Sequence, residues 1–190
     1  MTLAAPQVPI RVDPETGIWT TDGLPMIYLP RHYYVNHIDA FEAAFGRDAV
    51  KAVLYEAGYR SAWQWCEKEA ATHGLGGLDV FRHYMNRLSQ RGWGRFTIEA
   101  LNEASGEAVI RVDHSIYVCH HGHDARRRLC YPFAGWFPGA IEWAGRDLGL
   151  SWTLTSEEVC CAGEGSDHCR FEVRPRALGT VVGPETEPRS

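Results

Sequence analysis

The residues with the clearest capacity for chemistry gather near the C-terminus, in the segment 157–171. This segment holds three cysteines, one histidine and several carboxylates around a turn broken by glycines. Thiolates suit a soft or borderline cation, and a carboxylate oxygen can complete its coordination shell. Glu158, Cys161 and Cys169 could supply three such ligands, because the two glycines between the cysteines let the backbone fold tightly enough to bring them together.

The same residues also fit a simpler alternative, a hairpin with buried free cysteines. Thiols behave as small hydrophobic groups when they are buried, and Cys66, which falls in a helical pattern, is most simply a core residue. The spacing of Cys161 and Cys169 is not the paired C-x-x-C that would favour a metal. The residue types alone therefore leave metal binding and simple burial both open.

A second group of metal-ligating side chains lies in mid-chain. His114 precedes Cys119, His120, His121 and His123, so three histidines and a cysteine fall within five residues. Neighbouring side chains diverge on a strand, which disfavours a separate metal site here. We expect a surface loop or the lip of a pocket, with one histidine acting as a hydrogen-bond donor.

Hydrophobic periodicity predicts the elements that position these residues. In chain order they are two short strands at 17–19 and 26–29, helices over 33–46, 50–71 and 79–92, strands over 95–102 and 107–118, a helix over 129–146 that Pro138 kinks or delays, and strands over 152–159 and 170–173. This order predicts a mixed α/β or α+β domain with a mainly antiparallel sheet and about four helices on one face. Gly58 lies on a stripe of small residues inside a helix, which predicts close packing against a neighbour.

Size and charge narrow the classes of function. The 190 residues are enough for one domain with a substantial core. A net charge of -5 and an isoelectric point near 6.0 argue against a general nucleic-acid binder, which needs a basic face. The basic run Arg126-Arg127-Arg128 is interpreted as a solvated turn or as the salt-bridge partner of another protein.

The sequence also carries expectations about location. No apolar run approaches the ~20 residues of a membrane helix, and the N-terminus lacks a basic-then-apolar signal. Six cysteines without an export signal predict reduced thiols and a cytoplasmic protein. There is no phosphate-binding G-x-x-x-x-G-K loop, dinucleotide-binding G-x-G-x-x-G or helix-turn-helix motif, so a nucleotide cofactor and a complete transcription activator are not expected.

The C-terminal segment resembles the 4-vinyl reductase domain family, which includes the sensory domains of phenol- and xylene-responsive transcription activators. The family motif runs Glu-x-x-Cys, then Ala-Gly and a polar turn that ends in Asp-His-Cys. Residues 158–163 and 167–169 reproduce it, with seven residues between Cys161 and Cys169. Cys130 matches a further family cysteine by order and context, although its separation from the motif is a few residues longer.

This resemblance implies a zinc site made of Cys130, Glu158, Cys161 and Cys169. Such a set is closed and tetrahedral, so it stabilises a fold rather than catalysing a reaction. The resemblance also implies a domain over 29–174, preceded by an N-terminal arm over 1–28 with a short hairpin and followed by a flexible tail over 175–190. Homodimerisation is expected, because the sensory relatives pair through this domain.

The resemblance further implies a pocket for a small hydrophobic or aromatic molecule. The predicted ligand-binding residues are His114, Tyr117, His121, Trp136 and Phe137. No catalytic residue is predicted. Two alternatives stay open: an accessory subunit that docks on a larger flavin- or iron–sulfur-dependent oxidoreductase, and a small enzyme that uses the histidines at 120, 121 and 123.

Overall fold

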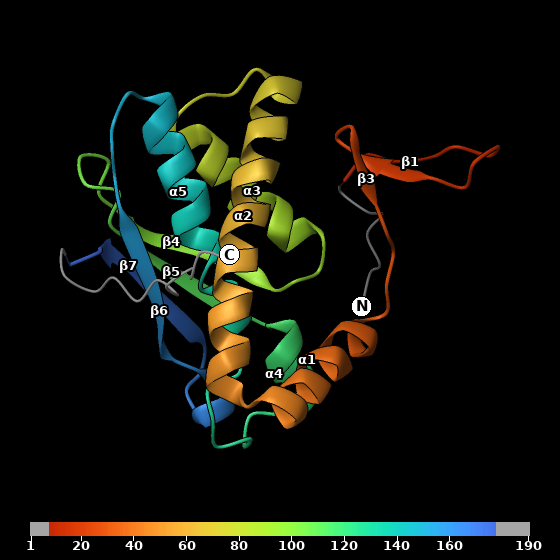
Figure 1. The fold of residues 1–190 in the computed structure, drawn as a ribbon, viewed down its shortest axis with the longest axis vertical. Coiled ribbons are helices and arrows are strands. Elements are labelled where there is room, and N and C mark those ends of the chain that lie inside the picture. The colour runs from red at the N-terminus through yellow and green to blue at the C-terminus, as the bar shows by residue number, and fades with distance from the viewer. Residues whose placement is uncertain (1–7, 178–190) are drawn as a thin grey trace, which may run out of the picture.

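The computed structural model describes residues 8–177, so the first seven residues and most of the predicted tail lie outside the described part. A layer of helices packs against a four-stranded sheet, and a small three-stranded sheet stands to one side of the helices (Figure 1). The predicted α+β class is confirmed. Within residues 8–177 no helix is both long and apolar enough to cross a membrane.

The small sheet is formed by the N-terminal segment. Its strands, in spatial order, are β1 (Ile10–Val12), β2 (Trp19–Thr21) and β3 (Leu24–Met26), all antiparallel. Asp22 and Gly23 form the turn between β2 and β3 with φ of 53° and 75°. Positive φ at both central residues is the geometry of a two-residue hairpin turn that matches strand twist, and Asp-Gly is a preferred pair there.

Three helices follow, close to the ranges predicted from periodicity. They are α1 (Arg31–Phe45), α2 (Arg47–His73) and α3 (Leu78–Gln90). Gly74 ends α2 in the left-handed conformation, with φ of 64°, as glycine commonly does after a helix. Gly58 lies against α5 (Trp136–Asp147): a Cβ there would be 2.5 Å from Cδ1 of Trp136, so the predicted close packing is confirmed.

The main sheet is antiparallel throughout, in the order β4-β5-β7-β6. Its strands are β4 (Arg95–Leu101), β5 (Ala108–Asp113), β6 (Leu154–Cys160) and β7 (Cys169–Pro175). Buried and more exposed residues alternate along β5, β6 and β7. One face of the sheet therefore packs against the helices, which is the usual arrangement in an α+β domain.

The strand predicted over 107–118 was too long, because a short helix, α4 (Ile116–His121), replaces its second half. His114 takes φ of 55°, and the Ser115 hydroxyl caps the helix by accepting a hydrogen bond from the Tyr117 N–H. The β-forming residues Ile116, Tyr117 and Val118 favoured a strand, and the serine cap was the overlooked feature. His120 and His121 therefore end a helix instead of lying on a loop.

The helix predicted over 129–146 begins later than expected, at Trp136. Pro138 is its third residue, and a proline is tolerated only in the first turn because its ring clashes with the carbonyl four residues earlier. A 3-10 turn, η1 (Tyr131–Phe133), precedes the helix. Cys130 was expected to open the helix, but it lies just before this 3-10 turn.

Candidate metal centre

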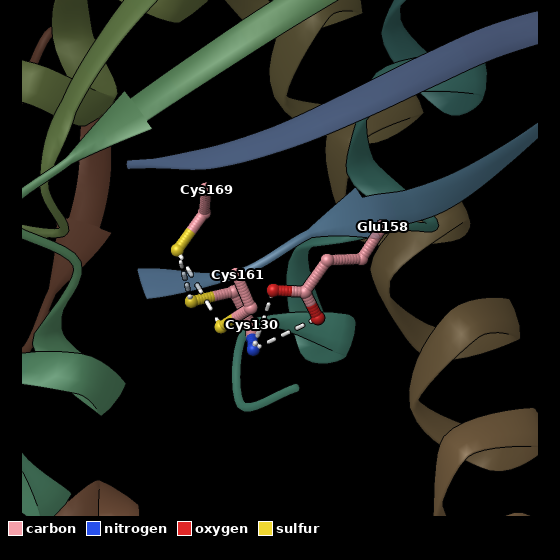
Figure 2. A group of neighbouring side chains, drawn as sticks. All are labelled: Cys130, Glu158, Cys161 and Cys169. Atoms are coloured by element: carbon pink, nitrogen blue, oxygen red, sulfur yellow. Dashed lines mark hydrogen bonds between the residues drawn. The ribbon is translucent and has the colours of Figure 1, made fainter. Parts of the chain in front are cut away.

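Four side chains converge where the last hairpin meets the segment before α5. Glu158 lies on β6, Cys161 follows that strand, Cys169 begins β7, and Cys130 comes from the segment before η1 (Figure 2). The chain between the two hairpin cysteines folds into a second 3-10 turn, η2 (Ala162–Glu164), which Gly165 closes with φ of 95°. The antiparallel pairing of β6 with β7 then sets both cysteines at one end of the sheet.

The ligand atoms of these four residues lie within 4.8 Å of one another. Cys130 Sγ is 3.4 Å from Cys169 Sγ, which is 3.6 Å from Cys161 Sγ. Tetrahedral zinc with bonds of about 2.3 Å separates its sulfurs by about 3.8 Å. The four residues are between 0% and 4% exposed. The arrangement therefore has the size of a closed tetrahedral metal site.

Backbone N–H groups point at the sulfur atoms. Cys161 Sγ accepts hydrogen bonds from the N–H groups of Leu129 and Gly163, each at 3.3 Å, and Cys169 Sγ accepts one from Ala162 at 3.4 Å. A Cβ at position 163 would lie 2.7 Å from a Leu129 methyl carbon, so glycine permits this close approach. N–H donors stabilise negative charge on sulfur. The site is thus built to hold thiolates.

The electrostatics of the cluster limit how much charge it carries without a cation. Burial raises the pKa of the Cys130 thiol well above its ordinary value. Burial, with the nearby Cys161 charge, raises the pKa of the Glu158 carboxyl to about 9. Hydrogen bonds from Cys130 and Cys169 lower the pKa of Cys161, so this thiol carries the first negative charge. Further ionisation needs a positive partner, which a divalent cation would provide.

The neighbouring polar residues of the motif point elsewhere. Cys160 Sγ lies 3.8 Å from the His168 carbonyl oxygen, and the His168 ring bonds the Asp167 carboxylate at 2.7 Å. Neither Cys160 nor His168 belongs to the group of four candidate ligands.

The arginine run at 126–128 makes contacts within the chain. Arg127 bonds Glu42, and Arg128 bonds the Glu158 carbonyl oxygen. The prediction of a solvated turn or a partner protein's salt bridge therefore missed these internal contacts.

The residues predicted to bind a ligand separate into two groups. Tyr117, Trp136 and Phe137 are part of an aromatic cluster around Phe133, whose ring centroid is 5.0 Å from Tyr117 and 4.9 Å from Trp136. The two histidines, His114 and His121, lie outside this cluster. His114 is exposed at the turn before α4. His121 Nε2 pairs with Asp39 at 3.3 Å.

A pocket of about 420 Å³ opens beside the aromatic cluster, between the segment that joins β3 to α1 and the turn that precedes β4. Tyr34, Trp93 and Ile116 line it. The ring of Trp93 makes edge contacts with Tyr34 at 5.3 Å and with Trp136 at 5.1 Å, which connects the pocket to the cluster. Tyr34 was not among the predicted residues, since its place beside Trp93 depends on how α1 packs.

Comparison with known proteins gives the family and the fold. The family model described as "Domain of unknown function (DUF5943)" matches residues 4–99, about half of the chain. The chain belongs to this family. No curated protein matches it.

Several solved structures resemble the chain, and two of them bear on its fold. One is the phenol-responsive sensory domain of the transcription activator PoxR, solved with phenol. It has a TM-score of 0.72 at 19% identity, and the match covers 87% of this chain and 84% of the PoxR domain. A vinyl-4-reductase family protein from Methanocaldococcus jannaschii has a TM-score of 0.50 at 15% identity, covering 80% of this chain and 85% of its own. The resemblance inferred from the cysteine motif is confirmed for the fold.

Proposed function

We propose that this chain is a zinc-stabilised domain that binds a small hydrophobic or aromatic molecule. The observation that carries the proposal is the convergence of Cys130, Glu158, Cys161 and Cys169 into one buried group beside an aromatic cluster. Three thiolates and one carboxylate suit zinc and leave no position for a reacting water. We therefore assign the metal a structural role.

The metal would stabilise the aromatic cluster through two connections that start at Cys130. Tyr131–Phe133 follow this cysteine directly, and Phe133 lies at the centre of the cluster. The thiol of Cys130 also bonds the Ser115 hydroxyl at 3.0 Å, and that hydroxyl caps the helix that carries Tyr117. Loss of the metal would free both segments, so binding of metal and binding of ligand should be coupled.

We place the ligand in the pocket in front of Tyr34 and Trp93. The fold similarity to a phenol-responsive domain supports a small aromatic ligand. The Tyr117 hydroxyl is buried and interacts with the Tyr34 hydroxyl, whose side chain lines the pocket. An apolar pocket with one or two polar groups is typical of small-molecule sites. Tyr117 would act on a ligand hydroxyl through Tyr34, which lines the pocket, while Trp136 and Phe137 support the wall.

A thermal-shift screen with phenol and substituted phenols tests this assignment. A ligand that binds only the folded protein raises its melting temperature. We expect a rise for the wild type, a clearly smaller rise for Tyr117→Phe, and an unchanged rise for the control Tyr33→Phe, since Tyr33 is exposed on α1. A wild type that responds to no phenol, or a Tyr117→Phe variant that responds fully, would contradict the assignment.

A docking role is the second candidate, and a specific feature favours it. Apolar side chains are exposed on the N-terminal sheet and the segment after it, including Ile27 at 77% and Tyr28 at 83%. Exposed apolar patches often mark protein interfaces. A second copy of this chain or a larger oxidoreductase subunit could cover them, within a cytoplasm that keeps the thiols reduced.

Purification from the native host separates these possibilities. A complex with a larger subunit supports the accessory role, and a dimer that Tyr28→Asp dissociates supports pairing of two copies. A monomer at every stage would count against both.

A further inference from the structure

A second group of ligating side chains lies far from the cysteines, between the N-terminal sheet and the helices. Asp22 is in the β2–β3 turn, Glu69 and His73 are one turn apart on α2, and His83 is on α3. One ligand atom from each lies within 4.8 Å of the others. Residues from three elements therefore meet at one point.

Two of the three distances are close to those between ligands of a common cation, and the shortest is that of a hydrogen bond. His73 Nε2 is 3.4 Å from Asp22 Oδ1 and 3.2 Å from Glu69 Oε2, and His83 Nε2 is 2.9 Å from the same Glu69 oxygen. Ligand atoms at about 2.1 Å from a tetrahedral ion are separated by about 3.4 Å. Glu69 and His73 stand four residues apart, a spacing that places both side chains on one face of a helix.

Glu69 gives an independent reason to expect a cation. Its side chain is fully buried, and Oε1 has no hydrogen-bond partner within residues 8–177. Its ion-pair partners in that range are the two histidines. A buried carboxylate oxygen without a partner is costly. A metal ion held by the carboxylate and the imidazoles would satisfy it.

Arginines limit the charge that the group can accept. Arg87 contacts both oxygens of Asp22 at 3.0 Å, so it offsets one of the two carboxylates and holds Asp22 in place. Arg91 lies with its guanidinium over the Trp65 ring, 5.1 Å from the centroid, and its positive charge interacts at longer range with both Glu69 and Asp22. An ion-pair network without metal is the alternative, and it leaves Glu69 Oε1 unsatisfied.

We propose that Asp22, Glu69, His73 and His83 form a second metal site, for a divalent first-row transition metal. Two imidazoles and two carboxylates favour zinc, cobalt, iron or manganese over the softer ions that thiolates select. The site ties the N-terminal sheet to α2 and α3, because Asp22 is its one ligand outside those helices. The His73 side chain is 30% exposed, so the ion can enter the site from solvent.

A titration of the chelator-treated protein with Co²⁺ tests this proposal. Cobalt bound to thiolates gives a near-ultraviolet charge-transfer band, whereas every bound cobalt ion contributes visible bands. We expect the near-ultraviolet band to saturate at one equivalent while the visible absorbance keeps rising to two. In His73→Ala/His83→Ala the second rise should disappear, and in the control His32→Ala/His37→Ala, where both histidines are exposed on α1, it should persist.

The outcome separates this site from the cysteine site. If the visible absorbance and the near-ultraviolet band both stop rising at one equivalent of Co²⁺, the second site is overturned and the cysteine site is unaffected. A second equivalent that survives in His73→Ala/His83→Ala would also overturn it. The wild-type titration needs no substitution, so the proposal remains testable even where the double variant fails to fold.

Discussion

The two clusters of ligating residues are built in opposite ways. The cysteine cluster takes three of its four candidate ligands from one hairpin, is buried throughout and receives hydrogen bonds from backbone N–H groups. The carboxylate–imidazole cluster draws its ligands from three elements, has partly exposed histidines and places an arginine on one of its carboxylates. Buried thiolates from a single hairpin suit a permanent structural ion. Partly exposed oxygen and nitrogen ligands from separate elements suit an exchangeable ion.

The largest effect should follow removal of the hairpin thiolates. We expect Cys161→Ser/Cys169→Ser to lose zinc and to lower the free energy of unfolding by about 3 kcal/mol or more, because metal binding contributes directly to folding. Zinc analysis and urea denaturation measure the two effects. Cys160→Ser is the matched control, since this neighbour lies outside the cluster. Equal zinc content in both proteins would contradict the assignment.

Chelation kinetics should separate the two sites in the wild type. Metal bound at Asp22, Glu69, His73 and His83 should leave at least about ten times faster than metal bound by the cysteines, because solvent reaches the histidines but not the thiolates. A coloured chelator under native conditions records the release as two phases. A single phase of metal release would contradict this prediction, because it would mean that solvent exposure of the ligands does not set the release rate.

A packing substitution tests whether the clusters depend on ligands or on general stability. A Cβ at position 139 would overlap the carbonyl oxygen of Tyr59, where α5 meets α2. We expect Gly139→Ala to lower the free energy of unfolding by about 2 kcal/mol, since overpacking forces the helices apart. Both metal equivalents should remain in the folded protein at low temperature. Loss of either metal would mean that the clusters respond to packing rather than to their own ligands.

The smallest effect should come from the ion pairs of Asp113, a carboxylate that belongs to neither cluster. Hydrogen bonds from Arg111, and then from Arg95, lower the pKa of Asp113 to about 2. A lowered pKa stabilises the fold above the ordinary value of 3.8, and this stability is lost as the pH falls towards 2. Both arginines are partly exposed, so Asp113→Asn should cost about 1 kcal/mol at pH 7.

Denaturation at several pH values checks this last prediction. The difference between the wild type and Asp113→Asn should shrink below about pH 4 and vanish near pH 2. A difference that stays constant down to pH 2 would show that the asparagine acts through packing instead.

The contrast between the clusters also explains what the sequence could predict. The Cys161–Cys169 turn is local, so its ligand types and spacing can be seen along the chain, and the family resemblance added Cys130. Glu69 and His73 share one face of α2, but the helix predicted over 50–71 ended before His73, and His83 and Asp22 join them only through the packing of α3 and the N-terminal sheet. Sequence patterns indicate contacts within one element better than contacts between elements.

The errors in secondary structure concern where two helices, α4 and α5, begin. The residues at 116–118 favour strands by propensity, and a single hydrogen bond from a backbone N–H to Ser115 was enough to begin a helix. Pro138 signalled a delay in the helix after Cys130, but the sequence did not show that Gly135, just before the helix, packs closely against Tyr55 on α2. The helical order and the antiparallel sheet, which rest on long periodic segments, were predicted correctly.

X-ray absorption at the zinc edge tests the central claim most directly, on protein that carries one equivalent of zinc. The account predicts three sulfur neighbours at about 2.3 Å and one oxygen neighbour at about 2.0–2.2 Å. A first shell of nitrogen and oxygen alone, or a protein that retains no zinc, would contradict it.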